Sequence, residues 1–406
     1  MKIKSIEGGV CAAKGFRAAG VPAEIKYKGR NDVALVVADA PCAAAAVFTT
    51  NAVAAAPVLY DREAVRGGRI QAILANSGCA NACTGAPGLA DAKRSAVETA
   101  KTLGIDPKLV LVASTGVIGH RMPVDRLVAG MKAAAAQLAA TPEAGLAAEK
   151  AVMTTDTKPK QAAVQVKIGG RTVTVGGMCK GSGMIEPNMA TMLGFITTDA
   201  AITPAMLRRA LRQAIAVSFN HVVVDGDEST NDSVFLLASG AAGNPLIAKA
   251  GPDYDAFAAA LTAVGVSLAR QMAADGEGAT KYVEVTVRHA KTQRDADRAA
   301  RAVAKSPLAK TSWFGKDPNW GRVLAAVGAS GAKIDERTVE VFYGKTWAYK
   351  QGKVADSVQL KKLAAELEGP EVTVTVDLHF NSSREAVIYT CDFSTEYVHI
   401  NADYTT

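Results

Sequence analysis

The sequence predicts a layered α/β (α+β) protein with two lobes or domains. Three observations lead to this fold class. The chain has 406 residues, more than one hydrophobic core usually organises. Strand-like runs alternate with helical patterns in the N-terminal half, whereas several strands follow one another in the C-terminal half. Consecutive strands joined by hairpins favour mixed or antiparallel sheets over a doubly wound parallel sheet.

The N-terminal half is expected to contain four strands, because apolar runs occur over 32–39, 45–51, 69–78 and 108–116. Helices are expected over 88–104, where small and apolar residues recur at helical spacing before a glycine, and over 123–140, which opens with a proline. The segment 141–160 has the appearance of a long connection.

The middle of the chain predicts a hairpin over 162–177, with Gly169-Gly170 at its turn. The uncharged run "TMLGFITT" (191–198) has the composition of a buried strand. A helix over 203–219 follows, with Thr203 as its N-cap and Pro204 in its first turn. The later elements are strands over 221–226 and 233–240, a helix over 254–275, the strands "YVEVTVRH", "TVEVFYG", "EVTVTVDLHF" and "AVIYTCDF", and helices near 292–304 and 356–368.

The composition of the chain argues against nucleic acids and membranes as partners. The net charge is +7 with basic and acidic residues interspersed, and aromatic residues are only 5%. Such a chain has little material for stacking bases, so no nucleic-acid partner is expected. No apolar run reaches the ~20 uninterrupted residues of a membrane-spanning helix, and the N-terminus has no signal-peptide core, so no membrane association is expected. The six scattered cysteines do not form a disulfide pattern, and a cytoplasmic location is the simplest interpretation.

The sequence gives little support for a metal site or for a Ser/His/Asp catalytic triad. Cys79 and Cys83 lack a second pair at zinc-site spacing, so small buried thiols are the better interpretation and no metal is expected. The acidic turn 225–233 lacks the glycine of a calcium loop. His120 and His221 are interpreted as structural or substrate-facing residues, because no nucleophile-elbow motif accompanies them.

Two loops remain candidates for a site. In "GGMCKGSG" (176–183) the phosphate-loop pattern fails, yet Lys180 among glycines would present a cation to a carboxylate or an oxyanion, with a surface turn as the equal alternative. The run "SWFGKDPNWGR" (312–322) is rich in bulky and polar residues, which fits a pocket and a well-packed corner equally well.

Thr191 has a special position between a small alanine and a strand. A threonine hydroxyl is a poor nucleophile unless a base takes its proton, and the α-amino group of an N-terminal residue is such a base. A free α-amine has a pKa of ~7.7–8.0, which suits general-base work. In mid-chain, this chemistry requires prior cleavage between Ala190 and Thr191; an ordinary strand residue is the alternative.

The segment "KGSGMIEPNMATMLGFITTDA" (180–200) resembles the signature of the ornithine acetyltransferases, also called glutamate N-acetyltransferases, of arginine biosynthesis. Further similar motifs occur in the same order over nearly the whole chain. They are "VFTTN" (47–51), "NSGCANACTG" (76–85), "ASTGVIG" (113–119), "MTTDT" (153–157), "VDGDESTND" (224–232), "DGEGATK" (275–281), "WFGKDPNWGR" (313–322) and "YVHINADYTT" (397–406).

This resemblance implies a two-lobed fold with stacked α-β-β-α layers, shared with self-processing aminopeptidases. It implies self-cleavage into an α chain, 1–190, and a β chain, 191–406, that assemble as an α2β2 heterotetramer. It also implies acetyl transfer from N2-acetyl-L-ornithine to L-glutamate without a cofactor. Whether acetyl-CoA is a second acetyl donor, which would make the enzyme an N-acetylglutamate synthase as well, stays open.

The resemblance assigns roles to individual residues. Thr191 would be the nucleophile in both reactions, while Thr115 and Gly116 match the oxyanion-hole positions. The positions that match substrate contacts are Thr154, Lys180, Thr191, Glu277, Asn401 and Thr406. Two other functions remain as alternatives: a self-processing aminopeptidase, in which water is the acceptor, and a non-catalytic amino-acid-binding protein that never cleaves.

Overall fold

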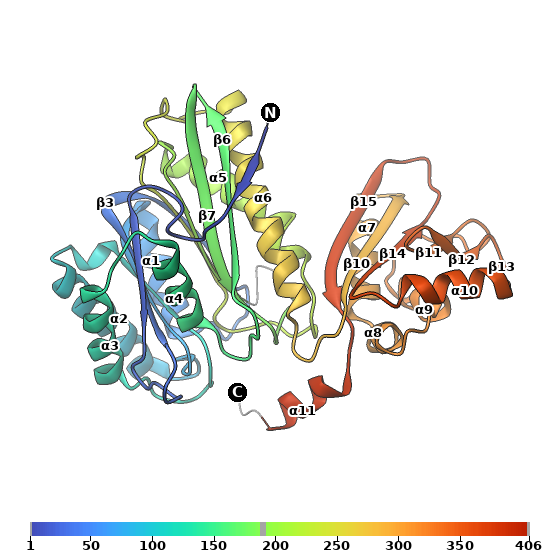
Figure 1. Ribbon diagram of the computed structural model, residues 1–406, viewed down its shortest axis with the longest axis horizontal. Coiled ribbons are helices and arrows are strands. Elements are labelled where there is room, and N and C mark those ends of the chain that lie inside the picture. The colour runs from blue at the N-terminus through green and yellow to red at the C-terminus, as the bar shows by residue number, and fades with distance from the viewer. Residues whose placement is uncertain (1, 187–191, 404–406) are drawn as a thin grey trace.

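The computed structural model describes residues 2–186 and 192–403, which form two lobes on separate sheets (Figure 1). The large lobe contains a nine-stranded sheet in the order β1-β6-β7-β8-β9-β3-β4-β5, with β2 paired to β3. Parallel and antiparallel pairs are mixed, as predicted. The strands are β1 (Lys4–Ile6), β2 (Phe16–Val21), β3 (Val33–Phe48), β4 (Arg69–Asn76), β5 (Val110–Ser114), β6 (Lys160–Ile168), β7 (Arg171–Lys180), β8 (Leu193–Thr198) and β9 (Ser233–Ala238).

Strand β3 folds this sheet into two layers. Residues 33–38 pair with β2, and 33–37 also with β4, whereas residues 43–48 pair with β9. The register on β4 shifts between Val37 and Cys42, and the strand bends there. A strand that bends or bulges in this way leaves one layer and joins the other. The two runs expected as separate strands over 32–39 and 45–51 are therefore one continuous strand.

Three buried apolar clusters show the α-β-β-α layering. Alternate residues of β3 face opposite sides: Val33, Leu35 and Val37 pack under α2 and α3, whereas Ala34 and Val36 face the second strand layer. The outer face of β6–β9 packs under α5 and α6. The two-lobed, layered α/β fold is confirmed. The helices of this lobe are α1 (Ala56–Ala64), α2 (Gly85–Leu103), α3 (Val124–Ala136), α4 (Pro142–Val152), α5 (Pro204–Ala216) and α6 (Pro252–Ala274).

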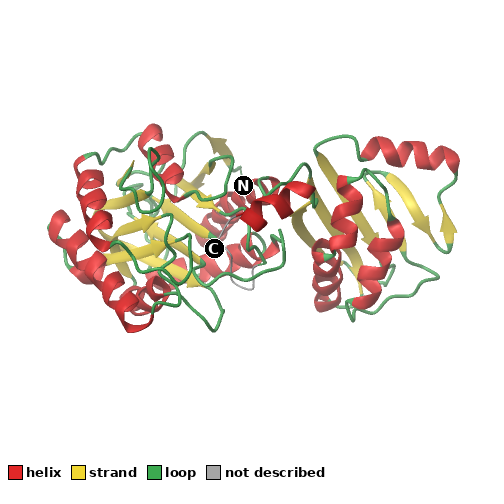
Figure 2. Ribbon diagram, turned by 90° about the horizontal axis from the view of Figure 1, so that it is seen from below, coloured by secondary structure: helices red, strands yellow, loops and turns green. Residues whose placement is uncertain are grey.

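The small lobe has a six-stranded sheet in the order β13-β12-β11-β14-β10-β15. Alanines and Val303 of α7, at helical spacing, pack on this sheet, and α9 contacts α7. Figure 2 shows the C-terminal helix α11 between the two lobes. The elements are β10 (Tyr282–Ala290), α7 (Gln293–Lys305), α8 (Pro307–Phe314), α9 (Trp320–Ala329), β11 (Glu340–Tyr343), β12 (Thr346–Lys350), β13 (Lys353–Val354), α10 (Ser357–Glu366), β14 (Glu371–Asp377), β15 (Arg384–Cys391) and α11 (Thr395–Asp403).

Two further expectations about elements are wrong. The supposed connection 141–160 contains α4, which the Thr141 hydroxyl caps by accepting the Ala144 N–H at 3.2 Å. Residues 221–226 do not form a strand of either sheet. This valine run is buried because it crosses between the lobes: Val223 belongs to the core of the small lobe, and Val222 and Val224 to that of the large one.

Among the described residues, only α6 is long and apolar enough by composition to cross a membrane. This helix packs against β6, β7 and α5 within the large lobe, and more than half of its most apolar stretch is buried. Its apolar character is accounted for by its place in the core.

Candidate active site

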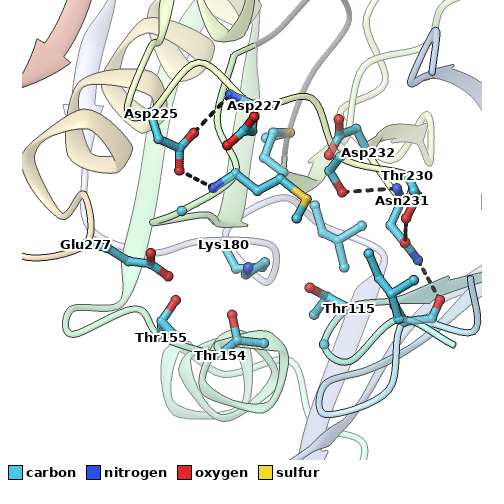
Figure 3. Close-up of a pocket in the computed structure, with 18 of the residues that line it drawn as sticks. Thr115, Thr154, Thr155, Lys180, Asp225, Asp227, Thr230, Asn231, Asp232 and Glu277 are labelled. Atoms are coloured by element: carbon cyan, nitrogen blue, oxygen red, sulfur yellow. Dashed lines mark hydrogen bonds between the residues drawn. The ribbon is translucent and has the colours of Figure 1, made fainter. Parts of the chain in front are cut away.

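A cavity of about 340 Å³ opens where several loops of the large lobe meet the C-terminal helix (Figure 3). The loop after β5, the loop after α4, the end of β7, the segment before β9 and the loop after α6 all contribute to its wall. Its lining residues are Ala80, Thr115, Gly116, Ile118, Thr154, Thr155, Lys180, Gly183, Met184, Met192, Leu193, Asp225, Asp227, Ser229, Thr230, Asn231, Asp232, Glu277, Tyr397 and Asn401.

The structure brings six of the predicted site residues to this one cavity: Thr115, Gly116, Thr154, Lys180, Glu277 and Asn401. The predicted residues Ala190, Thr191 and Thr406 lie outside the described residues. Met192, the neighbour of Thr191 in the chain, borders the cavity and is fixed by its carbonyl, which accepts the Ser233 N–H at 3.0 Å.

Thr115 and Gly116 form a tight turn at the end of β5. The Thr115 N–H donates to the Asn76 carbonyl at 3.0 Å, and the Val117 N–H donates to the Gly78 carbonyl at 3.4 Å. Gly116 has a φ of +129°, and a Cβ there would lie 2.4 Å from the Gly78 carbonyl carbon. Only glycine fits this position. The turn thus sets a hydroxyl and a glycine backbone side by side in the cavity wall, which suits stabilisation of an oxyanion.

Lys180 is the last residue of β7 and provides a cation in the wall of the cavity. Figure 3 shows it between Glu277 on one side and Thr115 on the other. Its side chain is only 10% exposed, and its Nζ lies 3.8 Å from Oδ2 of the fully buried Asp156. A buried, charge-balanced ammonium group of this kind suits the carboxylate of an amino-acid substrate.

Glu277 and Asn401 join the loop after α6 to the C-terminal helix. The Asn401 Nδ2 donates to the Glu277 Oε2 at 2.7 Å, across 124 positions of the chain. The backbone N–H of Glu277 donates to the Ser182 carbonyl at 2.8 Å. A Cβ at Gly183 would lie 2.3 Å from the Glu277 carboxylate, so the glycine permits this close approach. The pair places an anionic group opposite the ammonium of Lys180.

Sequence reasoning missed the role of the acidic segment 225–233. The Asp225 carboxylate accepts the N–H groups of Met184 at 2.5 Å and Ile185 at 2.7 Å, and burial raises the pKa of this carboxyl above its usual range. Asn231 donates from Nδ2 to the Ser114 carbonyl at 2.8 Å and so ties the segment to the Thr115 turn. The segment therefore supports the cavity walls. The available signal was the turn-rich acidic composition of this segment.

Other predicted candidates lie elsewhere. Trp313 is fully buried, Trp320 stacks on Tyr349 with ring centroids 4.8 Å apart, and no residue of the run 312–322 lines the cavity. Neither His120 nor His221 lines the cavity. Within residues 2–186 and 192–403, no group of three or more His, Cys, Asp or Glu side chains has the arrangement of a metal site.

Comparison with known proteins agrees with the motifs. A profile of the ArgJ family matches residues 17–406. The arginine biosynthesis bifunctional protein ArgJ of Symbiobacterium thermophilum is 53% identical over 405 residues, which cover 99% of both chains. The protein of the same name from Geobacter sulfurreducens is 48% identical over 393 residues, covering 97% of this chain and 99% of the relative.

Solved structures were also compared. The crystal structure of the ornithine acetyltransferase of Mycobacterium tuberculosis, complexed with ornithine, is 42% identical. It matches with a TM-score of 0.44 and covers 47% of this chain and all of its own. The profile match and the full-length relatives are sufficient for assignment: the chain belongs to the ArgJ family.

Proposed function

We propose that this enzyme transfers the acetyl group of N2-acetyl-L-ornithine to L-glutamate, after cleaving itself between Ala190 and Thr191. The observation that carries the proposal is the convergence of six matched residues on one cavity that the neighbour of Thr191 also borders. Thr191 acts as the nucleophile of both reactions, and its own α-amine serves as the base for acetyl transfer once cleavage has released it.

Self-cleavage begins when the Thr191 hydroxyl attacks the Ala190 carbonyl carbon. The acyl group moves from nitrogen to oxygen, the α-amine is released, and water hydrolyses the resulting ester. The Thr115 hydroxyl and the Gly116 N–H stabilise the oxyanion that develops at the attacked carbonyl. The products are an α chain ending at Ala190 and a β chain beginning with Thr191.

Acetyl transfer then follows a ping-pong course. The Thr191 hydroxyl gives its proton to the α-amine and attacks the acetyl carbonyl. The α-ammonium then returns this proton to the nitrogen of the tetrahedral intermediate, and ornithine leaves as an amine. The amine of L-glutamate attacks the acetyl-threonine ester, N-acetylglutamate leaves, and the threonine hydroxyl is restored. Lys180 binds the substrate carboxylate, and Glu277, held by Asn401, faces the cationic part of the donor.

Denaturing electrophoresis with intact-mass measurement tests the first step. We expect two fragments, 1–190 and 191–406, from the wild-type chain and a single uncut chain from Thr191→Ala. A wild-type chain that stays whole contradicts the proposal and favours a non-catalytic binding protein.

The transfer step is tested by the acceptor. Incubation with N2-acetyl-L-ornithine should release ornithine only slowly without L-glutamate, and N-acetylglutamate should form when L-glutamate is added. Rapid hydrolysis that is indifferent to L-glutamate favours the aminopeptidase-like alternative. Because the relatives carry the name bifunctional, a second assay supplies acetyl-CoA in place of acetylornithine. N-acetylglutamate formed there assigns the additional synthase activity, and its absence limits the enzyme to acetyl recycling.

The assembly and location follow the same proposal. An α2β2 heterotetramer predicts a native mass of two cleaved pairs, which light scattering measures. A cytoplasmic location fits substrates that are intermediates of amino-acid biosynthesis.

A further inference from the structure

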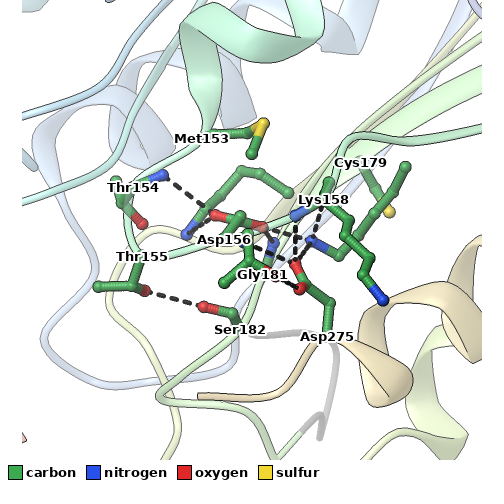
Figure 4. A network of polar contacts seen from close by, with 12 residues as sticks. Met153, Thr154, Thr155, Asp156, Lys158, Cys179, Gly181, Ser182 and Asp275 are labelled. Atoms are coloured by element: carbon green, nitrogen blue, oxygen red, sulfur yellow. Dashed lines mark hydrogen bonds and ion pairs between the residues drawn. The ribbon is translucent and has the colours of Figure 1, made fainter. Parts of the chain in front are cut away.

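The buried polar network around Asp156 and Asp275 (Figure 4) also includes Lys160, a lysine that does not line the cavity. Lys160 is the first residue of β6 and is 1% exposed. It pairs across the hairpin with Cys179, which precedes Lys180 in the chain. The two ammonium groups thus belong to the same end of one hairpin. Asp156 is the carboxylate that they share, with Lys160 at 2.8 Å and Lys180 at 3.8 Å.

Asp156 accepts three hydrogen bonds without Lys180. Oδ1 accepts the Lys160 ammonium at 2.8 Å and the Gly181 N–H at 2.7 Å, and Oδ2 accepts the Thr154 N–H at 3.0 Å. Burial by itself would raise the pKa of Asp156, but the two lysine charges and these donors outweigh it and hold that pKa well below its usual range. Asp156 is therefore an anion at every working pH.

Lys180 is left charge-balanced but not hydrogen-bonded. At 3.8 Å its Nζ is beyond the hydrogen-bond distance from Asp156, and among the described residues it donates no hydrogen bond. Its N–H donors are available to a ligand in the cavity. A carboxylate as buried as Asp156 attracts any nearby ammonium group strongly, so a second cation is needed to keep this separation.

Asp275 is the second carboxylate partner of Lys160. Its Oδ2 accepts the Lys160 ammonium at 2.6 Å and the N–H groups of Thr157 at 3.0 Å and Lys158 at 3.2 Å. Lys160 thus bridges two buried carboxylates, and its pKa is raised: burial opposes the shift, and Asp156 and Asp275 outweigh it.

We propose that Lys160 is a positioning residue for substrate binding: by satisfying Asp156, it keeps the ammonium of Lys180 free for the carboxylate of the substrate. This inference rests on the proposed function for the identity of the ligand. Without the charge of Lys160, Lys180 would close onto Asp156 and withdraw its donors from the cavity.

The primary test is Lys160→Gln, which removes the charge and keeps N–H donors on a side chain one atom shorter. We expect the dissociation constant of L-glutamate, measured by calorimetry, to rise about 10- to 100-fold, the equivalent of one charge-assisted hydrogen bond. KM should rise by a similar factor while kcat changes little. Asp275→Asn is the matched control, because it disturbs the same network but leaves Lys160 on Asp156, and its affinity should stay within about threefold.

Two double variants separate position from net charge. K160Q/D156N and K160Q/D275N restore the same total charge to the network, but only the first removes the carboxylate that attracts Lys180. We expect glutamate affinity to recover in K160Q/D156N and to remain low in K160Q/D275N. Equal recovery in both variants, or wild-type affinity in K160Q itself, overturns the proposal. Thermal melts of all four variants identify any that fail to fold.

A crystal structure of K160Q provides a readout that does not depend on the reaction. The Lys180–Asp156 separation should shorten from 3.8 Å to hydrogen-bond distance. An unchanged separation overturns the positioning role. If the separation shortens but the wild-type protein binds no glutamate, the positioning role is retained and the proposed substrate is wrong.

Discussion

At the scale of single residues, Thr115 is the group whose removal is most informative. Its hydroxyl lines the cavity, and its backbone is fixed by the Asn76 carbonyl, so truncation removes the hydroxyl without freeing the turn. We expect Thr115→Ala to slow both self-cleavage and acetyl transfer by about 10²–10³-fold, the usual cost of one oxyanion donor. Quantified gels and the transfer assay measure the two rates.

Thr115→Ser is the matched control, because it keeps the hydroxyl and loses only a methyl group. It should remain within about tenfold of the wild-type rates. Near-wild-type rates in Thr115→Ala would contradict a role for the hydroxyl and would mean that backbone N–H groups alone stabilise the oxyanion.

The site residues divide into those that sequence could identify and those it could not. Lys180 could be predicted from chemistry alone, because glycines on either side let a ligand come close to the backbone beside a lysine charge. Thr154 and Asn401 were accessible only through the family motifs. Asn231 lies in the motif 224–232, but its role could not be predicted, since its amide donates to the Ser114 carbonyl 117 positions away. Supporting residues of this kind recognise backbone atoms, which have no sequence signature.

At the scale of elements, helix α4 contains a group that links stability to pH. Glu149 is fully buried against the large sheet, and neither carboxylate oxygen has a hydrogen bond of normal geometry among the described residues. Burial, opposed by the charge of Lys160, raises the pKa of Glu149 from 4.5 to about 8. The folded protein then keeps a proton that the unfolded chain releases, so stability falls as pH rises from 4.5 to about 8.

Glu149→Gln should abolish this dependence. We expect the wild-type free energy of unfolding to decline relative to the variant by up to about 1.4 kcal/mol per pH unit across that window. Denaturant unfolding at several pH values measures it. Glu143→Gln, an exposed change on the same helix, should leave the slope unaltered. Parallel wild-type and Glu149→Gln curves would show that Glu149 is ionised in the folded protein.

Element prediction succeeded where local signals and tertiary packing agree. Helices α5 and α6 follow apolar periodicity with proline near their starts, and the hairpin of β6 and β7 follows its Gly-Gly turn. It failed for α4, because the whole segment 141–160 was interpreted as a connection although Thr141 and Pro142 are a helix start signal. The strand prediction for 221–226 also failed, because a valine run that is buried between the lobes has the same apolar sequence as a buried strand.

At the scale of the whole molecule, the proposed cleavage leaves strands of both fragments interleaved in the nine-stranded sheet of the large lobe. Strands β8 and β9 belong to 191–406 but lie between β7 and β3 of 1–190. Strand β8 pairs with β7 from Leu193 to Thr198, and β9 pairs with β3 from Ser233 to Ala238. The buried cluster under α5 and α6 also draws side chains from both fragments.

The two fragments should therefore remain one folded body after cleavage. Separating them requires breaking two strand ladders and a shared core, so we expect co-elution on native size exclusion and separation only in denaturant. Because unfolding of the cut protein releases two chains, its Tm should rise with protein concentration relative to an uncut Thr191→Ala control at the same oligomeric state. Fragments that elute separately in native buffer, or a concentration dependence identical in the two proteins, would contradict this interleaved arrangement.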